Sequence, residues 1–210
     1  MASFKQYLIE RKKSGGTLYV FDIDDTLFRT TAQIRVVKDG KIARTLTSQE
    51  FNDYKLGDGE RFDYGEFTDA EKFNSESTPI TKMIQTLVRL HNKVKLNLTP
   101  GSKVIISTAR GILDDEETFH DTFRDHGIDI DNIEANHAEH GKGASPAERK
   151  NSVARRYLDA HDYDACYMYD DSKTNLTYFI QLKHEYPNVD FRAYLIDEDG
   201  KMSEFTAEAR

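Results

Sequence analysis

The sequence has little of what marks membrane, disulfide-rich or disordered proteins. Its longest uninterrupted apolar run, Ala165 to Tyr169, is five residues long, far below the roughly 18 that a membrane-spanning helix needs. The single cysteine, Cys166, excludes an intramolecular disulfide framework and zinc sites built on several thiolates. Proline occurs only 4 times and tryptophan not at all, but 12 Phe and 11 Tyr supply apolar area that offsets the entropy of ordering the chain. The 210 residues therefore predict either one folded domain with an insertion or a large and a small domain.

The sequence also has fewer basic than acidic residues. The 29 Lys and Arg against 37 Asp and Glu give a formal net charge of -8, which opposes non-specific attraction to nucleic-acid phosphates unless basic residues cluster on one face. A small anionic ligand is compatible with this balance, because one cation and a few aimed donors can outweigh net charge locally. The first dozen residues lack the apolar stretch of a secretory signal, so we expect a cytoplasmic protein without a membrane partner. The sequence does not predict an oligomeric state.

Short apolar runs rich in branched residues alternate with longer segments of helical period. This alternation is typical of a parallel sheet with crossover helices, so the predicted fold class is α/β. The predicted strands are Thr17 to Asp24, Lys103 to Thr108, Asn132 to Ala135, Ala165 to Asp170 and Phe191 to Ile196.

Helix signals lie between these strands. The segment from Pro79 to about residue 92 has apolar residues at three- and four-residue spacing, with Thr78 as the expected N-cap. Ser145, Pro146 and Glu148 form a capping box with proline in the first helical position. We also expect helices around residues 119–127, through residues 176–180 and over residues 3–13.

The residues between the first strand and Pro79 break this alternation. Asp39 and Gly40 stand between two runs of alternating apolar residues, which is a strong signal for a β-hairpin. Six aromatic residues follow, namely Phe51, Tyr54, Phe62, Tyr64, Phe67 and Phe73. We predict that residues 29–78 form a small cap or lid inserted into a core domain of residues 1–28 and 79–210. The aromatic residues either give this insertion a core of its own or line a pocket for an organic leaving group.

Acidic residues follow two of the predicted strands. Asp22 and Asp24 come at the end of the first strand, on the same face, and Asp170 and Asp171 come at the end of the fourth. Open parallel sheets bind ligands at the edge formed by the carboxyl ends of their strands, and Thr108 brings a hydroxyl to the same edge. Clustered carboxylates repel each other unless a cation lies between them. Oxygen ligands without thiolates favour a hard cation, most simply Mg²⁺.

These residues resemble the motifs of the haloacid dehalogenase (HAD) superfamily of phosphotransferases. Asp22, Asp24 and Thr26 match the family's DxDxT motif, and Thr108 begins a Thr-Ala-Arg that is similar to its Thr-Gly-Arg. The resemblance implies a three-layer Rossmann-like parallel sheet with a small inserted lid. The chain as a whole is also similar to phosphatase-like proteins of tailed phages, which would place it in the host cytoplasm.

The third and fourth motifs of this family extend the resemblance to about residue 176. Lys150 fits best as the third-motif lysine, with Lys142 as the alternative. The pair Asp170 and Asp171 matches the fourth motif. We assign no chemical role to Asp25, which we expect to be a solvated or capping residue.

The resemblance implies a role for each matched residue. Asp22 would attack phosphorus and form an aspartyl phosphate, and Asp24 would protonate the leaving oxygen and then activate water. The Asp22 carboxylate, the Asp24 backbone carbonyl and Asp170 would hold Mg²⁺, with Asp171 orienting its shell. The residues expected at the phosphoryl group are Thr108, Ala109, Arg110 and Lys150, where Arg110 either touches substrate or braces its loop.

An acid at the position of Asp24 is found in the family's phosphatases and phosphomutases. The resemblance therefore implies a Mg²⁺-dependent phosphomonoesterase acting on a small-molecule phosphate ester, most simply a nucleotide or sugar phosphate. A polynucleotide end, as in 3′-phosphatases with this core, is an alternative that requires a local basic stripe, which the net charge of -8 does not encourage. A catalytically silent module that binds phosphate is the alternative outside the enzymes.

Overall fold

The computed structural model describes residues 15–137 and 145–206, so the helix expected over residues 3–13 and the alternative lysine Lys142 lie outside the described residues. Its centre is a six-stranded sheet with the order β11-β10-β9-β1-β7-β8, parallel except for the edge strand β11. The strands are β1 (Thr17–Phe21), β7 (Lys103–Thr108), β8 (Glu134–His137), β9 (Ala165–Asp170), β10 (Asp190–Ile196) and β11 (Met202–Phe205). The predicted α/β class with a mostly parallel sheet is confirmed.

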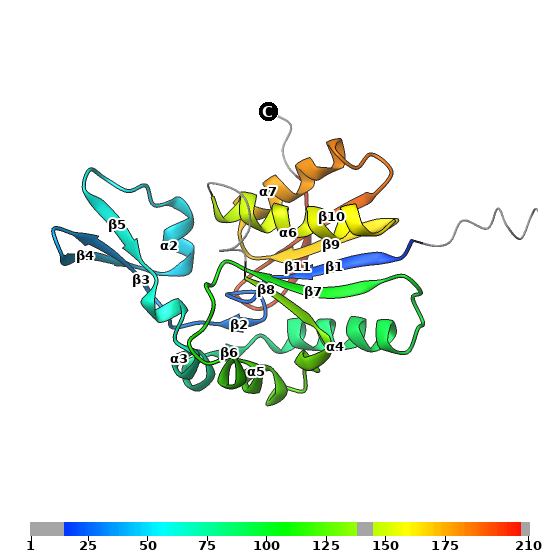
Figure 1. Ribbon diagram of the computed structural model, residues 1–210, viewed down its shortest axis with the longest axis horizontal. Coiled ribbons are helices and arrows are strands. Elements are labelled where there is room, and N and C mark those ends of the chain that lie inside the picture. The colour runs from blue at the N-terminus through cyan, green and yellow to red at the C-terminus, as the bar shows by residue number, and fades with distance from the viewer. Residues whose placement is uncertain (1–14, 138–144, 207–210) are drawn as a thin grey trace, which may run out of the picture.

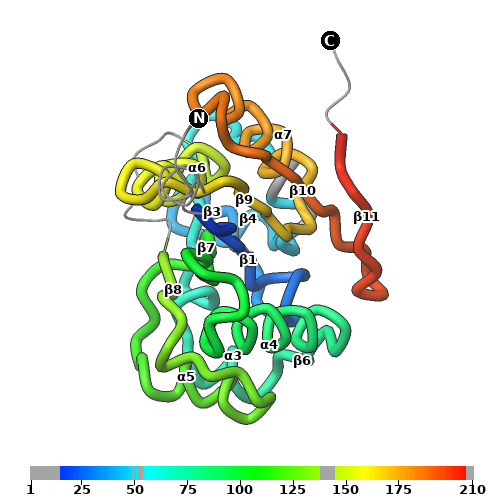
Figure 2. Tube along the Cα trace, turned by 90° about the vertical axis from the view of Figure 1, so that its right-hand side faces the viewer, coloured from blue at the N-terminus to red at the C-terminus, as the bar shows by residue number. Residues whose placement is uncertain are grey.

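Helices cover both faces of this sheet (Figures 1 and 2). On one face lie α3 (Ala70–Glu76), α4 (Thr81–Lys95) and α5 (Glu116–Arg124), and on the other lie α6 (Pro146–Ala160) and α7 (Lys173–Gln181). Each face has its own buried cluster, with Phe21 and Ile106 in the first and Val20 and Ile105 in the second. Such burial on both faces explains why the strands are continuously apolar. No helix of residues 15–137 and 145–206 is long and apolar enough to cross a membrane.

The limits of three predicted strands are wrong, the smallest difference being at β10, which begins at Asp190 rather than Phe191. β1 ends at Phe21 rather than Asp24, because the chain turns after Asp22 and the amides of Leu27 and Phe28 both bond to the Ile23 carbonyl. β8 begins at Glu134 rather than Asn132, because the 3-10 turn η2 (Ile130–Asn132) occupies the expected start.

The structure confirms one predicted helix start and corrects another. At α6, the Ser145 hydroxyl accepts from the Glu148 amide and the Glu148 carboxylate accepts from the Ser145 amide, which is the predicted capping box. Thr78 is not an N-cap. Thr78–Pro79 instead forms the short strand β6, which pairs with β2 (Phe28–Arg29), and α4 begins after Ile80 without a side-chain cap. Thr78 and Pro79 are therefore held in an extended conformation by their pairing with β2, and the helix begins later than predicted.

Strand register brings three carboxyl ends together. Phe21 pairs with Ile106 on one side and with Tyr169 on the other. Asp22 follows Phe21, Thr108 lies two residues after Ile106, and Asp170 follows Tyr169. These polar residues therefore leave the central sheet at one edge, which we call the carboxyl edge.

Residues 34–63 form a second, smaller structure, which we call the β3–β5 unit. It consists of β3 (Ile34–Lys38), β4 (Lys41–Leu46), α2 (Ser48–Asp53) and β5 (Glu60–Asp63), with the antiparallel strand order β4-β3-β5. The predicted hairpin is confirmed, because Asp39 at φ 51° and Gly40 at φ 74° have the paired positive φ angles of a type I′ turn. The unit extends from the carboxyl edge at the left of Figure 1.

The rest of the inserted segment returns to the main body. The turn η1 (Gly65–Phe67) leads into α3, which packs on α5. Phe73 of α3 lies in the same buried cluster as Phe28 and Phe123, with its ring centroid 5.5 Å from that of Phe28. Residues 70–78 therefore pack with the main body, whereas the β3–β5 unit has its own small cluster.

Candidate functional site

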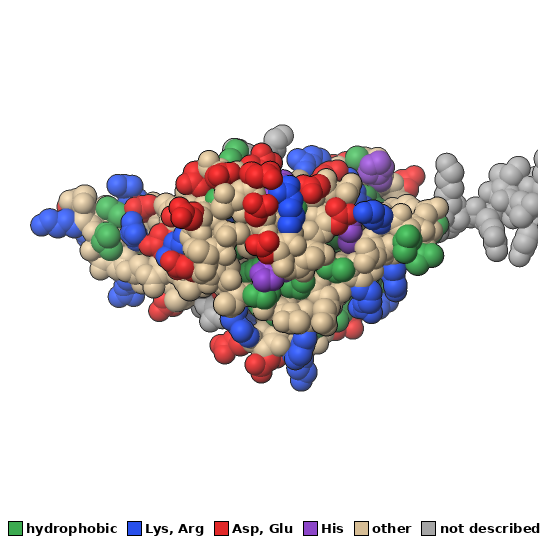
Figure 3. Space-filling view, turned by 90° about the horizontal axis from the view of Figure 1, so that it is seen from below, with side chains coloured by type: hydrophobic (Ala, Val, Ile, Leu, Met, Phe, Trp, Pro, Cys, Tyr) green, Lys and Arg blue, Asp and Glu red, His purple; other side chains and the backbone are tan. Residues whose placement is uncertain are grey.

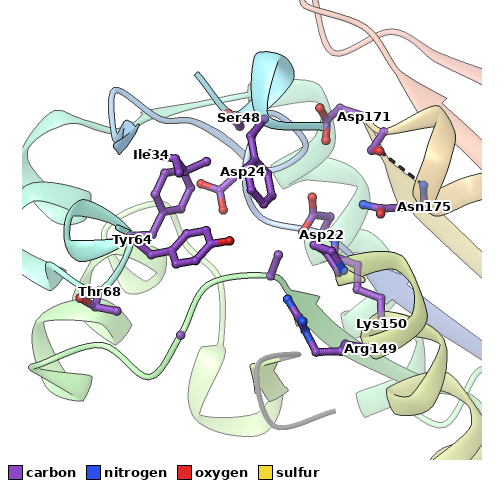
Figure 4. A pocket seen from close by; sticks show the side chains of 16 residues that line it. Asp22, Asp24, Ile34, Ser48, Tyr64, Thr68, Arg149, Lys150, Asp171 and Asn175 are labelled. Carbon is purple, nitrogen blue, oxygen red and sulfur yellow. Dashed lines mark hydrogen bonds and ion pairs between the residues drawn. The ribbon is translucent and has the colours of Figure 1, made fainter. Parts of the chain in front are cut away.

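A cavity of about 290 Å³ lies between the carboxyl edge and the β3–β5 unit (Figure 4). One wall is mostly polar and consists of Asp22, Asp24, Ala109, Gly111, Pro146, Arg149, Lys150, Asp171, Ser172 and Asn175. The other wall is largely apolar and consists of Ile34, Ser48, Phe51, Tyr64, Phe67 and Thr68. Such a pair of walls suits a small organic molecule that carries a charged group.

Three of the predicted carboxylates meet at the carboxyl edge. Asp22, Asp170 and Asp171 each offer an oxygen, and these oxygens lie within 4.8 Å of one another. Burial, with added repulsion from neighbouring carboxylates, raises the pKa of Asp22 and of Asp171 above the ordinary range, although Lys150 opposes both shifts. A divalent cation would relieve this repulsion. The oxygen-only donor set fits a hard cation such as Mg²⁺.

Lys150 of α6, one of the predicted site residues, contacts this cluster directly. Its Nζ is 2.7 Å from Asp22 Oδ1 and 2.8 Å from Asp170 Oδ2. Burial alone lowers the pKa of Lys150, but the charges of Asp170 and Asp22 outweigh it and leave the pKa above its ordinary value. Lys150 is therefore a fixed cation that holds both carboxylates in place.

Two residues that the sequence reasoning missed fix Asp170. The Ser172 amide donates to Oδ1 at 2.9 Å, and the Asn175 side-chain amide donates to Oδ1 at 3.0 Å. Ser172 is also the N-cap of α7, and Asn175 lies on its first turn. A signal for both was present, because an acidic pair directly before an N-capping serine places the first turn of the next helix over those carboxylates.

Asp24 is held by Arg110 and lies outside the carboxylate cluster. Arg110 Nη2 is 2.6 Å from Asp24 Oδ1, and Arg110 Nε is 3.0 Å from Asp24 Oδ2. The guanidinium is buried between the rings of Phe67 and Phe73, at 4.8 and 4.4 Å from their centroids, and also donates to Thr30. Arg110 is not among the residues that line the cavity. It braces Asp24 and its loop, which is one of the two roles that the sequence left open.

Thr108 is buried and does not line the cavity. Its hydroxyl accepts from the Arg110 amide at 3.1 Å and so shapes the loop after β7. Of the residues expected at the phosphoryl group, Ala109 and Lys150 lie on the cavity wall, and Gly111 joins them.

Asp25 links the carboxyl edge to the β3–β5 unit. Its carboxylate accepts a 2.7 Å hydrogen bond from the Ser48 hydroxyl at the start of α2. The residue is in the left-handed region at φ 54°, and burial raises its pKa, although the Ser48 bond lowers it. Asp25 is thus neither simply solvated nor a helix cap.

The six aromatic residues of the insertion divide into three groups. Phe51, Tyr64 and Phe67 line the cavity, and Figure 4 shows the Tyr64 side chain pointing into it. Tyr54 and Phe62 pack in the cluster of the β3–β5 unit, whereas Phe73 belongs to the main body. The insertion therefore has a small core of its own, and three of its aromatic residues line the cavity.

Arg149 is a cavity residue with no counterpart among the predicted site residues. It lies on the first turns of α6, beside Lys150, and Figure 4 shows it pointing into the cavity. In comparisons with known proteins, no protein-family model, curated protein or solved structure matches the chain.

Proposed function

We propose that the protein is a Mg²⁺-dependent phosphomonoester hydrolase of the HAD type, with a Rossmann-like core and the β3–β5 unit as its cap. The observation that carries the proposal is the convergence of Asp22, Asp170 and Asp171 around Lys150 beside a cavity. The proposal is supported by the resemblance of these residues to the first, third and fourth motifs of that superfamily, which occur in the same order along the chain.

Asp22 is the proposed nucleophile. Lys150 holds its Oδ1, which leaves Oδ2 to attack phosphorus. The new bond from Asp22 to phosphorus forms as the bond from phosphorus to the ester oxygen breaks. Water then attacks the aspartyl phosphate, which releases inorganic phosphate and restores the Asp22 carboxylate.

Asp24 is the proposed proton carrier between these two steps. It lines the cavity. Arg110 donates three hydrogen bonds of 3.1 Å or less to the Asp24 carboxylate, two to Oδ1 and one to Oδ2. A carboxylate oxygen has two acceptor sites, so Oδ2 keeps one for a proton. Protonated Asp24 gives this proton to the leaving oxygen, and the resulting carboxylate takes one from the attacking water.

Asp22, Asp170 and Asp171 would hold the Mg²⁺ ion, together with the backbone carbonyl of Asp24. When bound, the ion supplies charge stabilisation for the phosphoryl oxygens. Lys150 and the Ser172 and Asn175 donors keep two of the carboxylates oriented for it.

A small phosphate ester suits the cavity better than a polynucleotide end. The volume of about 290 Å³ is at the lower limit of small-molecule sites, and the apolar wall favours a nucleotide over a sugar phosphate. On the face seen from below in Figure 3, the basic side chains of the described residues are interspersed with acidic ones and do not form a stripe. A nucleic-acid substrate would need such a stripe.

Hydrolysis of an aryl phosphate with and without Mg²⁺ tests the proposal. We expect Mg²⁺-dependent release of phosphate that Asp22→Asn abolishes, and a beryllium fluoride adduct on Asp22 that the same variant cannot form. Asp190→Asn, which makes the same chemical change at an exposed position on β10, should keep full activity. Activity retained by Asp22→Asn would refute the role of Asp22 as the nucleophile. A beryllium fluoride adduct in a protein that hydrolyses none of a panel of nucleotides and sugar phosphates would favour the silent module.

A further inference from the structure

Arg149 is a half-buried cation that forms no ion pair with any residue in the described part of the chain. Its Nε is inaccessible to solvent and makes no hydrogen bond to any residue that the structure describes. A buried donor left without an acceptor costs free energy, so a shift of the guanidinium toward an acceptor on a bound ligand would be favourable. Because Arg149 points into the cavity, a molecule bound there can supply that acceptor (Figure 4).

The other cations of the site are already committed. Lys150 is bonded to Asp22 and Asp170, and Arg110 to Asp24. Arg155, six residues further along α6, is a paired arginine on the same helix, since its guanidinium makes two 2.7 Å bonds to Glu185. Among the described residues that line the cavity, Arg149 is therefore the cation that stays available.

The charges at the carboxyl edge indicate which kind of ligand Arg149 would bind. Four carboxylates at the carboxyl edge, those of Asp22, Asp24, Asp170 and Asp171, face the two committed cations. A divalent metal ion, together with the proton that Asp24 carries for the leaving oxygen, would leave this set with one positive charge. A phosphate ester then adds a dianion, and a third cation is needed to offset it.

We propose that Arg149 binds the non-bridging oxygens of the substrate's phosphate group. This inference rests on the proposed function and deepens it, because it assigns phosphate recognition to a residue other than the buried Thr108 and Arg110. The planar guanidinium can donate two parallel hydrogen bonds to a phosphate, which a lysine cannot. With the phosphate held at Arg149 and Lys150, the organic part of the ester faces Phe51 and Tyr64 on the opposite wall.

Calorimetric titration of the protein with inorganic phosphate in the presence of Mg²⁺ tests this contact without requiring turnover. Arg149→Gln should raise the Kd for phosphate by about 10- to 100-fold, since it removes charge-assisted hydrogen bonds. Arg149→Lys should raise it by a smaller factor, because the charge remains but the paired geometry is lost. Arg155→Gln on the same helix is the matched control and should leave the Kd unchanged.

An unchanged Kd in Arg149→Gln, or an equal rise in the Arg155 control, overturns the inference, as does a wild-type protein that binds no phosphate. If Arg149→Gln does not fold, Arg149→Lys decides, with a raised Kd in support and an unchanged Kd against. Phosphate binding that depends on Arg149 in a protein without turnover would overturn hydrolysis alone. Turnover with phosphate binding indifferent to Arg149 would overturn this inference alone.

Discussion

The two walls of the cavity are held in different ways. At the carboxyl edge, each carboxylate of the Asp22 and Asp170 pair is fixed by a buried bond to Lys150, and Asp170 has two further donors. The β3–β5 unit contributes an apolar wall that is tied to the main body by polar links at its base, among them the Ser48 bond to Asp25. The polar wall is thus built from the segments that follow the central strands and from the first turns of α6 and α7, whereas the apolar wall is attached to the main body by fewer polar contacts.

We therefore expect the polar wall to carry the reaction chemistry and the apolar wall to determine substrate selectivity. Groups that act on phosphorus need tight positioning, which buried strands and helix ends provide. Ile34 and Phe51 on the opposite wall can change without disturbing them, since both pack in the cluster of the β3–β5 unit. Phe67 is the exception, because its ring packs against Arg110. Changes at the carboxyl edge should therefore affect turnover and stability together, and changes in the β3–β5 unit should act mainly on substrate affinity.

The largest expected effect is at Arg110, which bridges the two walls. Arg110→Ala leaves the Asp24 carboxylate buried without its partner and removes the packing between Phe67 and Phe73. We expect the free energy of unfolding to fall by about 3 to 5 kcal/mol and activity to be lost. Urea denaturation and the aryl phosphate assay measure the two effects.

Arg155→Ala is the control for this change, because its ion pair with Glu185 is on the surface and should cost less than about 1 kcal/mol. A cost for Arg110→Ala no greater than that of the control would show that the two walls are not coupled through Arg110.

A smaller effect should appear at Asp171 on the polar wall alone. Burial and the neighbouring carboxylates raise its pKa from 3.8, so the folded metal-free protein keeps a proton that the unfolded chain has lost. Stability without metal is then full below the unfolded pKa and falls as the pH rises through the raised folded value. Asp171→Asn should flatten this fall and add on the order of 1 to 3 kcal/mol at neutral pH, while weakening the thermal stabilisation by Mg²⁺.

Thermal unfolding between pH 4 and pH 9, with and without Mg²⁺, measures both parts of this prediction. Asp190→Asn, exposed at the start of β10, should reproduce neither. A wild-type protein whose stability neither falls with rising pH nor responds to Mg²⁺ would contradict the view of this edge as a repulsive acidic cluster.

The same contrast explains how much the sequence could predict. The strands and their acidic ends follow from apolar runs and from the rule that parallel strands share an edge, so Asp22, Asp170 and Lys150 are found where expected. Residues that act through side-chain direction could not be predicted. Arg110 is itself a predicted site residue whose role the sequence left open, and Arg149 lies beside the predicted Lys150. Only packing decides that Arg149 points into the cavity and Arg110 into the protein.

The smallest effect should come from the Ser48 link at the base of the β3–β5 unit. Ser48→Ala removes the 2.7 Å bond to Asp25 and leaves that partly buried carboxylate one donor short, at a cost of about 1 kcal/mol. Because the bond joins the two walls without touching Lys150, we expect a KM raised a few-fold with kcat nearly unchanged. Hydrogen exchange should become faster in β3, β4 and β5 but not in β1 or β9. Ser203→Ala on the edge strand β11 is the matched control and should alter neither KM nor exchange in the β3–β5 unit. Equal acceleration of exchange in β1 and the β3–β5 unit would show instead that the two walls unfold as one.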